Sequence, residues 1–154
     1  MPDTAIIIGS DHAGYEMKEH IKAELAAKGI PFEDIGTYDT TSTDYPLWAG
    51  RVAKAVSHGT REKGIAICGS GIGASMAANR FRGVRAALCI TPEMARLSRE
   101  HNNANVLVLG GRITTPETAT EILWTWLDTA FEGGRHERRI AQIDEVAEEG
   151  GSKQ

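Results

Sequence analysis

Short apolar runs alternate along the chain with longer segments in which apolar residues recur at helical spacing. The runs predict five strands, at residues 5–10, 31–36, 64–69, 85–90 and 105–111. Most of these runs are continuously apolar, whereas a strand with one face in water would alternate apolar and polar residues. The pattern therefore indicates a parallel sheet that is buried on both faces.

The segments between the strands have the period of amphipathic helices. Met17, Ile21 and Leu25 lie on one face of a helix predicted over residues 13–28. We predict further helices over residues 48–58, 71–81 and 91–102. Another is expected from about Pro116, with Leu123, Leu127 and Phe131 on its apolar face. A last amphipathic helix is expected around Ile140, Ile143 and Val146, before a frayed tail at 148–154.

Alternating strands and helices are typical of a three-layer α/β domain. The chain has 154 residues, of which 41% are hydrophobic, and this is enough for one core but little for two. We therefore predict a single domain over residues 1–154, with a five-stranded parallel sheet, a core at about 4–147 and a C-terminal helical extension.

Composition argues against several classes of protein. A net charge of -4 offers no basic face for nucleic acid. Cys68 and Cys89 form no CxxC pair, so neither a disulfide framework nor a structural zinc site is expected. The first apolar run is too short for a signal peptide or a membrane span. We expect a cytoplasmic protein that binds neither nucleic acid nor membrane.

Three polar, glycine-rich clusters follow predicted strands: GSDHAG (9–14), CGSGIG (68–73) and LGGR (109–112). The carboxyl ends of parallel strands meet at one edge of a sheet, so the three clusters are expected to form a site there. Each cluster alone could be a tight turn. CGSGIG lacks the lysine of a P-loop, but it offers backbone N–H groups to an oxyanion or a phosphate.

Cys68 and Asp11 each have both a structural and a chemical interpretation, whereas Cys89 has only a structural one. Cys68 is either a small buried apolar residue or a thiol activated at the end of its strand. Cys89 has no glycine turn after it and is interpreted as a core residue. Asp11 is expected to cap a helix, a role that leaves a catalytic one open.

Two later segments carry the remaining polar groups. In EHNNAN (100–105), His101 could complement a helix dipole and Asn103 could adopt a left-handed cap, or the polar residues could belong to a site. GGRHERR (133–139) is either a solvated face or a phosphate grip, because its arginines recur one helical turn apart.

Together these motifs resemble one family. GSDHAGYEMKEHI, TDYP, ICGSGIGASMAANR, REHNNANVLVLGGR and EGGRHERR occur in the order and spacing of the sugar-phosphate isomerase family of ribose-5-phosphate isomerase B. The same family includes isomerases of galactose 6-phosphate, allose 6-phosphate and erythrulose 4-phosphate. The resemblance covers about residues 4–147.

The resemblance implies a Rossmann-like aldose–ketose isomerase that uses neither metal nor cofactor. It implies a homodimer, or a homotetramer formed as a pair of dimers, with the active site at the subunit interface. The expected reaction interconverts D-ribose 5-phosphate and D-ribulose 5-phosphate through an enediolate. Erythrulose 4-phosphate or a hexose 6-phosphate is the alternative substrate on the same machinery.

The family's roles can be carried onto matching positions. By resemblance, Cys68 shuttles the proton, and the backbone N–H groups of the segment 69–73, with Gly69, Gly71 and Gly73, hold the enediolate oxyanion. Ser70 stands where many members carry threonine and would assist ring opening or hold a sugar oxygen. Asp11 would bind the reacting hydroxyls or pass a proton between them. The other implied roles are ring opening for His101, sugar binding for Asn102, Asp44 and Tyr45, and phosphate binding for His12, Arg135, Arg139 and Arg112.

Two other classes of protein remain to be compared. A nucleotide- or flavin-binding module would use the glycine loop, but would not require His101 and the arginine cluster. An inactive subunit or a sugar-phosphate sensor would lack part of the catalytic set. Since Cys68, His101, Arg135 and Arg139 are all present, the sequence favours a self-sufficient enzyme.

Overall fold

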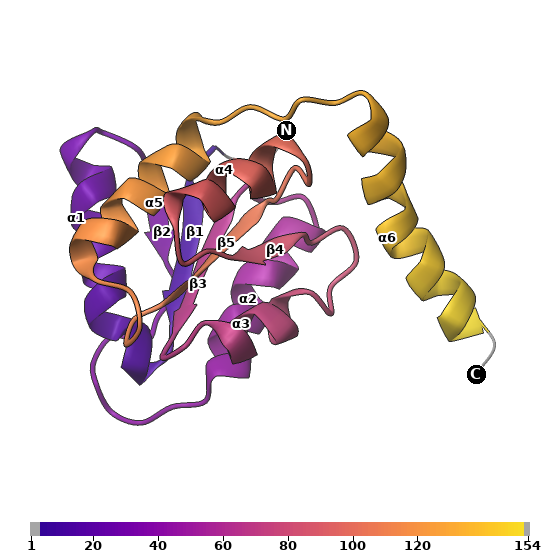
Figure 1. The fold of residues 1–154 in the computed structure, drawn as a ribbon. Coiled ribbons are helices and arrows are strands. Elements are labelled where there is room, and N and C mark those ends of the chain that lie inside the picture. Colours follow the sequence, from indigo (N-terminus) through magenta and orange to yellow (C-terminus); the bar gives the residue numbers. More distant parts are fainter. Residues whose placement is uncertain (1–3, 153–154) are drawn as a thin grey trace.

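The protein is built on one five-stranded parallel sheet (Figure 1). The structure, a computed structural model, describes residues 4–152. The sheet order is β2-β1-β3-β5-β4, and every neighbouring pair is parallel. Its strands are β1 (Ile6–Ser10), β2 (Phe32–Asp34), β3 (Gly64–Cys68), β4 (Ala86–Leu88) and β5 (Val106–Gly110). All five predicted strands are confirmed.

Helices cover both faces of the sheet, which gives a three-layer, Rossmann-like α/β fold (Figure 1). Successive strand residues point to opposite faces: Ile8 packs with α1, α4 and α5, and Ile7 packs with α2 and α3. The helices are a short 3-10 turn η1 (His12–Gly14), α1 (Tyr15–Ala27), α2 (Tyr45–Ser57), α3 (Ile72–Ala78), α4 (Pro92–Glu100), α5 (Pro116–Asp128) and α6 (Arg135–Ser152).

Some helix boundaries differ from the prediction. Phe131 was expected on the apolar face of α5, but that helix ends at Asp128, because Thr129 is already extended. Residues 101–102 lie in a turn after α4 instead of its last turn. At the C-terminus, α6 continues through 148–152, part of the segment expected to fray, because Ala147, Glu148 and Glu149 favour helix. Residues 153–154 lie outside the described part.

Helix α6 leans away from the sheet (Figure 1). It meets the body at the loop before β4, where the Gly83 N–H donates to the Asp144 carboxylate at 3.2 Å. Gly133 and Gly134 precede the helix with φ of +72° and +59°. Only glycine adopts two successive left-handed residues readily, so this pair sets the direction in which α6 leaves the body.

A buried lysine fixes the segment that leads from β2 to α2. Lys18 on α1 is fully buried, and its Nζ donates to the Asp34 Oδ1 at 2.5 Å and to the Thr37 carbonyl at 2.6 Å. Lys22 donates to the other carboxylate oxygen of Asp34 at 2.8 Å. Burial opposes ionisation of Asp34, but the bonds from Lys18 and Lys22 outweigh it and lower the pKa of that carboxyl.

Among the described residues, no helix has the length and apolarity needed to cross a membrane.

Candidate active site

The carboxyl ends of β1, β3 and β5 surround an open hollow of about 490 Å³. The structure thus brings together the three glycine-rich clusters that follow these strands. Of the residues predicted for the site, those that line the hollow are Asp11, His12, Tyr45, Cys68, Gly69, Ser70, Gly73 and Arg112. The hollow lies where the strand order reverses between β1 and β3, the usual place for a ligand in an open α/β sheet.

Cys68 ends β3 at the floor of this hollow and is 5% exposed. Its Sγ accepts a hydrogen bond from the Gly71 N–H at 3.2 Å. This bond holds the sulfur at the start of the glycine loop, on the side that lines the hollow. The other cysteine, Cys89, is fully buried in the core, and burial raises its pKa to about 11. Its interpretation as a core residue is confirmed.

The loop after Cys68 presents fewer donors than expected. The Gly71 N–H is taken by the sulfur, and the Ile72 N–H donates to the Ser70 Oγ at 3.1 Å. Within residues 4–152, the N–H groups of Gly69, Ser70 and Gly73 have no hydrogen-bond partner. These three remain for an oxyanion, whereas the N–H groups of Gly71 and Ile72 in the predicted segment 69–73 are already engaged.

Tyr45, the first residue of α2, closes one side of the hollow. A Cβ on Gly73 would lie 2.4 Å from the Tyr45 Cε1, so the absence of a side chain lets the phenol ring rest against the loop. Asp44, predicted to frame the sugar, is the N-cap residue of α2, but its side chain makes no cap hydrogen bond and is exposed. It does not line the hollow.

Asp11 and His12 lie on η1, directly after β1. Asp11 is 6% exposed, and its Oδ1 accepts the Gly14 N–H at 3.0 Å, which confirms its capping role. The His12 Nδ1 lies 3.1 Å from the Thr43 backbone nitrogen and 3.2 Å from the Thr43 carbonyl oxygen, so it accepts from the first or donates to the second, depending on the tautomer. When Nδ1 accepts from the Thr43 N–H in the neutral ring, Nε2 carries the proton and can donate to a ligand oxygen.

The other predicted site residues lie at the opposite edge of the sheet. Helix α4 starts beyond the carboxyl end of β4 and runs back, so His101 and Asn102 come just before the amino end of β5. Asn102 lines a separate hollow that also includes Ile143 of α6. Arg135 and Arg139 are exposed in the first turns of α6. Within one chain, the predicted site is therefore divided into two groups.

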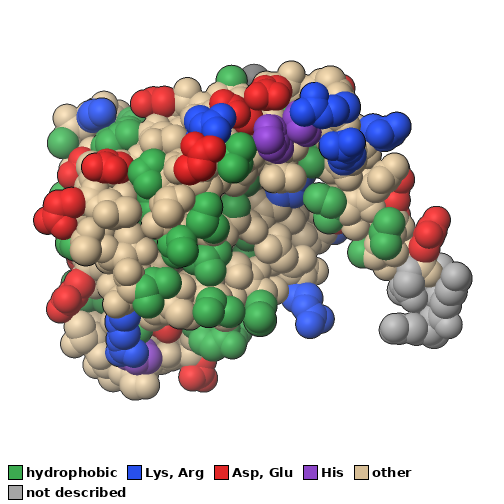
Figure 2. All heavy atoms as spheres, in the orientation of Figure 1, with side chains coloured by type: hydrophobic (Ala, Val, Ile, Leu, Met, Phe, Trp, Pro, Cys, Tyr) green, Lys and Arg blue, Asp and Glu red, His purple; other side chains and the backbone are tan. Residues whose placement is uncertain are grey.

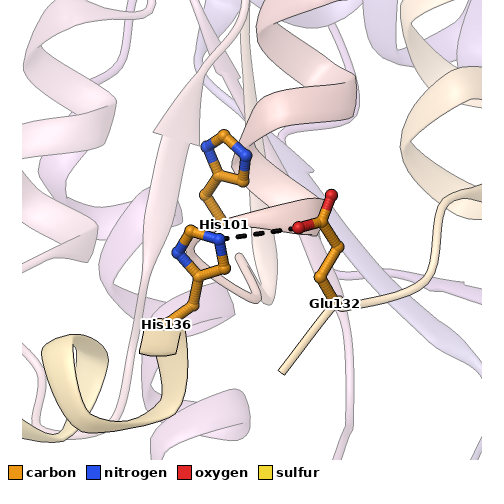
Figure 3. Close-up of side chains that lie close together, drawn as sticks. All are labelled: His101, Glu132 and His136. Carbon is orange, nitrogen blue, oxygen red and sulfur yellow. Dashed lines mark ion pairs between the residues drawn. The ribbon is translucent and has the colours of Figure 1, made fainter. Parts of the chain in front are cut away.

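His101 packs against a histidine to which the sequence assigned no site role (Figure 3). The rings of His101 and His136 stack at 4.4 Å with an angle of 17° between their planes. The His136 Nε2 lies 3.6 Å from the Glu132 carboxylate. Burial and the neighbouring charge of Arg135 lower the pKa of His136. No sequence motif indicates this stack, because it depends on how α6 leaves the body.

His101, Glu132 and His136 are also a group that could hold a metal ion. Their nitrogen and oxygen donor atoms all lie within 4.8 Å of one another (Figure 3). The lone pairs of a histidine lie in the ring plane, and the two planes here are nearly parallel. One ring would have to turn before both nitrogens could face a single ion.

Known proteins are similar to this chain over most of its length. The family model described as Ribose/Galactose Isomerase matches residues 6–143. The chain is 45% identical to ribose-5-phosphate isomerase B of Escherichia coli (strain K12) over 92% of its length and 95% of that protein.

Solved structures give the same result. The structure of a ribose 5-phosphate isomerase from Thermotoga maritima has 54% identity and a TM-score of 0.90, over 92% of this chain and 98% of that one. That of ribose-5-phosphate isomerase B from Mycoplasma genitalium with bound ribulose-5-phosphate has 40% identity and a TM-score of 0.90, over 97% and 99%.

Proposed function

The chain belongs to the ribose/galactose isomerase family, and on that premise we propose that it interconverts D-ribose 5-phosphate and D-ribulose 5-phosphate. It is an aldose–ketose isomerase. The observation that carries the assignment to this site is the Cys68 thiol, hydrogen-bonded by the Gly71 N–H in the hollow at the carboxyl edge. The reaction moves protons between neighbouring atoms of one molecule, so its balance needs no redox cofactor.

Cys68 is proposed as the base. In the direction from aldose to ketose, its thiolate takes the proton from C2 of the open-chain sugar and returns it to C1. The intermediate enediolate bears negative charge on oxygen, which the free N–H groups of Gly69, Ser70 and Gly73 can stabilise. Asp11 lines the same hollow and is proposed to pass the hydroxyl proton between the two oxygens.

Ring opening and phosphate binding are assigned to the second group. His101 is proposed to open the furanose, with Asn102 holding sugar oxygens. Arg135 and Arg139 lie one helical turn apart on α6, where Figure 2 shows cationic side chains gathered beside histidine. Two guanidinium groups at this spacing suit a phosphate dianion, with His12 and Arg112 approaching from the first group.

Because the two groups lie at opposite edges of one chain, we propose that each complete site forms between two chains. His101, Asn102, Arg135 and Arg139 of one subunit would close the Cys68 hollow of another. Uncovered apolar side chains support this assembly. Ile72 and Met76 on the rim of the hollow are 51% and 65% exposed, and Ile143 and Val146 on α6 are 51% and 65% exposed.

The location and the sugar are further parts of the proposal. Sugar phosphates are charged and do not cross the apolar core of a membrane unaided, so an enzyme that uses them is placed in the cytoplasm. Erythrulose 4-phosphate or a hexose 6-phosphate is the alternative substrate, because these sugars differ in the distance from phosphate to reacting carbon.

The test combines a substrate panel with the two cysteines. The kcat/KM of the purified protein should be highest for ribose 5-phosphate among tetrose, pentose and hexose phosphates. Cys68→Ala should lower kcat by ~10²- to 10⁴-fold, the usual contribution of a general base. Cys89→Ala is the matched control and should keep kcat close to wild type. A Cys68→Ala enzyme with near wild-type turnover would show that the base is another group.

A further inference from the structure

A third hollow, distinct from the Cys68 hollow and from the one that Asn102 lines, lies at the amino edge of the sheet. Its volume is about 480 Å³, within the range of small-molecule sites. It lies between the end of α2, the segment that enters β3, the residue before β4 and the turn between α4 and β5. The residues that line it are Val56, Gly59, Arg61, Glu62, Lys63, Arg85, Arg99, Asn103 and Asn105.

Three cations line this hollow without a carboxylate in ion-pair contact, although Glu62 lines it too. Lys63, Arg85 and Arg99 make no ion pair with any residue among those that the structure describes. Glu62 and Asp144 act only at longer range, on Lys63 and Arg85 respectively. The Lys63 Nζ and the Arg99 Cζ both lie 5.8 Å from the centre of the Trp126 ring, so these two cations share one neighbour.

The three charges disfavour one another. Burial lowers the pKa of Lys63, and the charge of Arg99 lowers it further. Burial and then the charge of Arg85 lower the pKa of Arg99 in the same way. Both shifts mean that the folded chain holds positive charge in a partly dehydrated place, where Glu62 and Asp144 offset it only at longer range.

Hydrogen bonds to the protein fix the two guanidinium groups in place, and Asn103 binds both of them. The Asn103 carbonyl accepts from the Arg85 Nε at 2.9 Å, and the Asn103 Oδ1 accepts from the Arg99 Nη1 at 2.9 Å. Arg99 also donates to the Ala104 carbonyl at 2.6 Å. These bonds explain why the arginines brace the turn, but they leave the charge unbalanced and give no role to Lys63, whose Nζ has no hydrogen-bond partner within residues 4–152.

We propose that this hollow binds a compact diphosphate group, through Lys63, Arg85 and Arg99. Three cations match the charge of a diphosphate better than that of a single carboxylate, and guanidinium groups held in advance lose little freedom on binding. The source is either inorganic pyrophosphate or the diphosphate of a nucleotide. The site is separate from the group on α6 that is assigned to the phosphate of the sugar.

Calorimetric titration of the full-length protein with pyrophosphate, without divalent cations, tests the site. Wild type should bind saturably, and Lys63→Met should weaken binding by about tenfold or more, the effect of losing one charge-assisted hydrogen bond. Lys54→Met, at an exposed lysine of α2 outside the hollow, is the matched control and should bind like wild type. Arg139→Ala should also bind like wild type.

Several results would overturn the site. These are no saturable binding by wild type, equal binding by Lys63→Met and Lys54→Met, or loss of binding only in Arg139→Ala, which would put the anion in the sugar-phosphate site. A parallel titration with ADP separates the two sources, because a nucleotide site should bind ADP more tightly than pyrophosphate. The isomerase activity of Lys63→Met should equal that of wild type, so failure of the proposed function would be seen independently.

Discussion

A site shared between two chains can be tested by mixing two inactive variants. Cys68→Ala removes the proposed base from the carboxyl-edge group, and His101→Ala removes the residue proposed to open the ring from the opposite edge. Each variant alone should be almost inactive, since every site in its assembly carries one defect. In a mixed dimer, one site combines both defects and the other site has none.

The expected recovery follows from the geometry. When the two variants are refolded together in equal amounts and pair at random, about half of the dimers are mixed, and one site in two of each mixed dimer is intact. About a quarter of all sites should therefore work, and kcat per chain should rise to about 25% of wild type. Steady-state isomerisation of ribose 5-phosphate, before and after mixing, measures this value.

The matched control mixes two defects from the same group. Cys68→Ala with Asp11→Ala should show no recovery, because both residues line one hollow and each mixed site keeps one defect. Activity of the first mixture that stays at the sum of its parents would refute the shared site. It would mean that one chain closes its own hollow.

Four further outcomes follow from side-chain contacts and burial. Gly73→Ala should push the Tyr45 ring out of the hollow, since the new Cβ would lie 2.4 Å from that ring. The KM for the sugar phosphate should then rise by about two- to tenfold. An unchanged KM would mean that Tyr45 does not bind the sugar. Lys18→Met should lower the free energy of unfolding in urea by about 3 kcal/mol, because it breaks a buried ion pair, and a loss below about 1 kcal/mol would contradict this. Folding lowers the pKa of Asp34, so the ionised carboxylate stabilises the wild-type fold above its ordinary pKa of about 4. This contribution disappears as pH falls through the lowered pKa, and it should be smaller in Lys18→Met. Iodoacetamide at neutral pH should leave Cys89 unmodified in the folded protein, as peptide mass spectrometry can show; rapid labelling would mean that its burial is wrong.

The fold could be predicted because each strand is marked by its own apolar run. Even the weakest strand, at 31–36, exists, although only Phe32–Asp34 pair with β1. The error at Phe131 has a local cause, since periodicity continued past the residue at which the backbone becomes extended. Helix ends are decided by such single residues, which a repeating pattern does not record.

The candidate site could be predicted in part. One rule about parallel sheets was enough to bring Asp11, Cys68 and Arg112 together, because each follows a strand. The same rule puts His101 at the other edge, since it follows a helix and precedes a strand. The stack with His136 had no such signal, because it joins segments whose relative position depends on the turn before α6.

Gly133 and Gly134, the glycine pair before α6, affect whether the proposed assembly stops at a dimer. A molecule with two complementary surfaces can exchange them reciprocally with one partner, or it can pass each to a different neighbour and grow into an open fibre. The angle between the surfaces selects the outcome, and Gly133 and Gly134 hold that angle with backbone conformations that other residues resist. Two residues that line none of the three described hollows would then decide between a closed pair and a polymer.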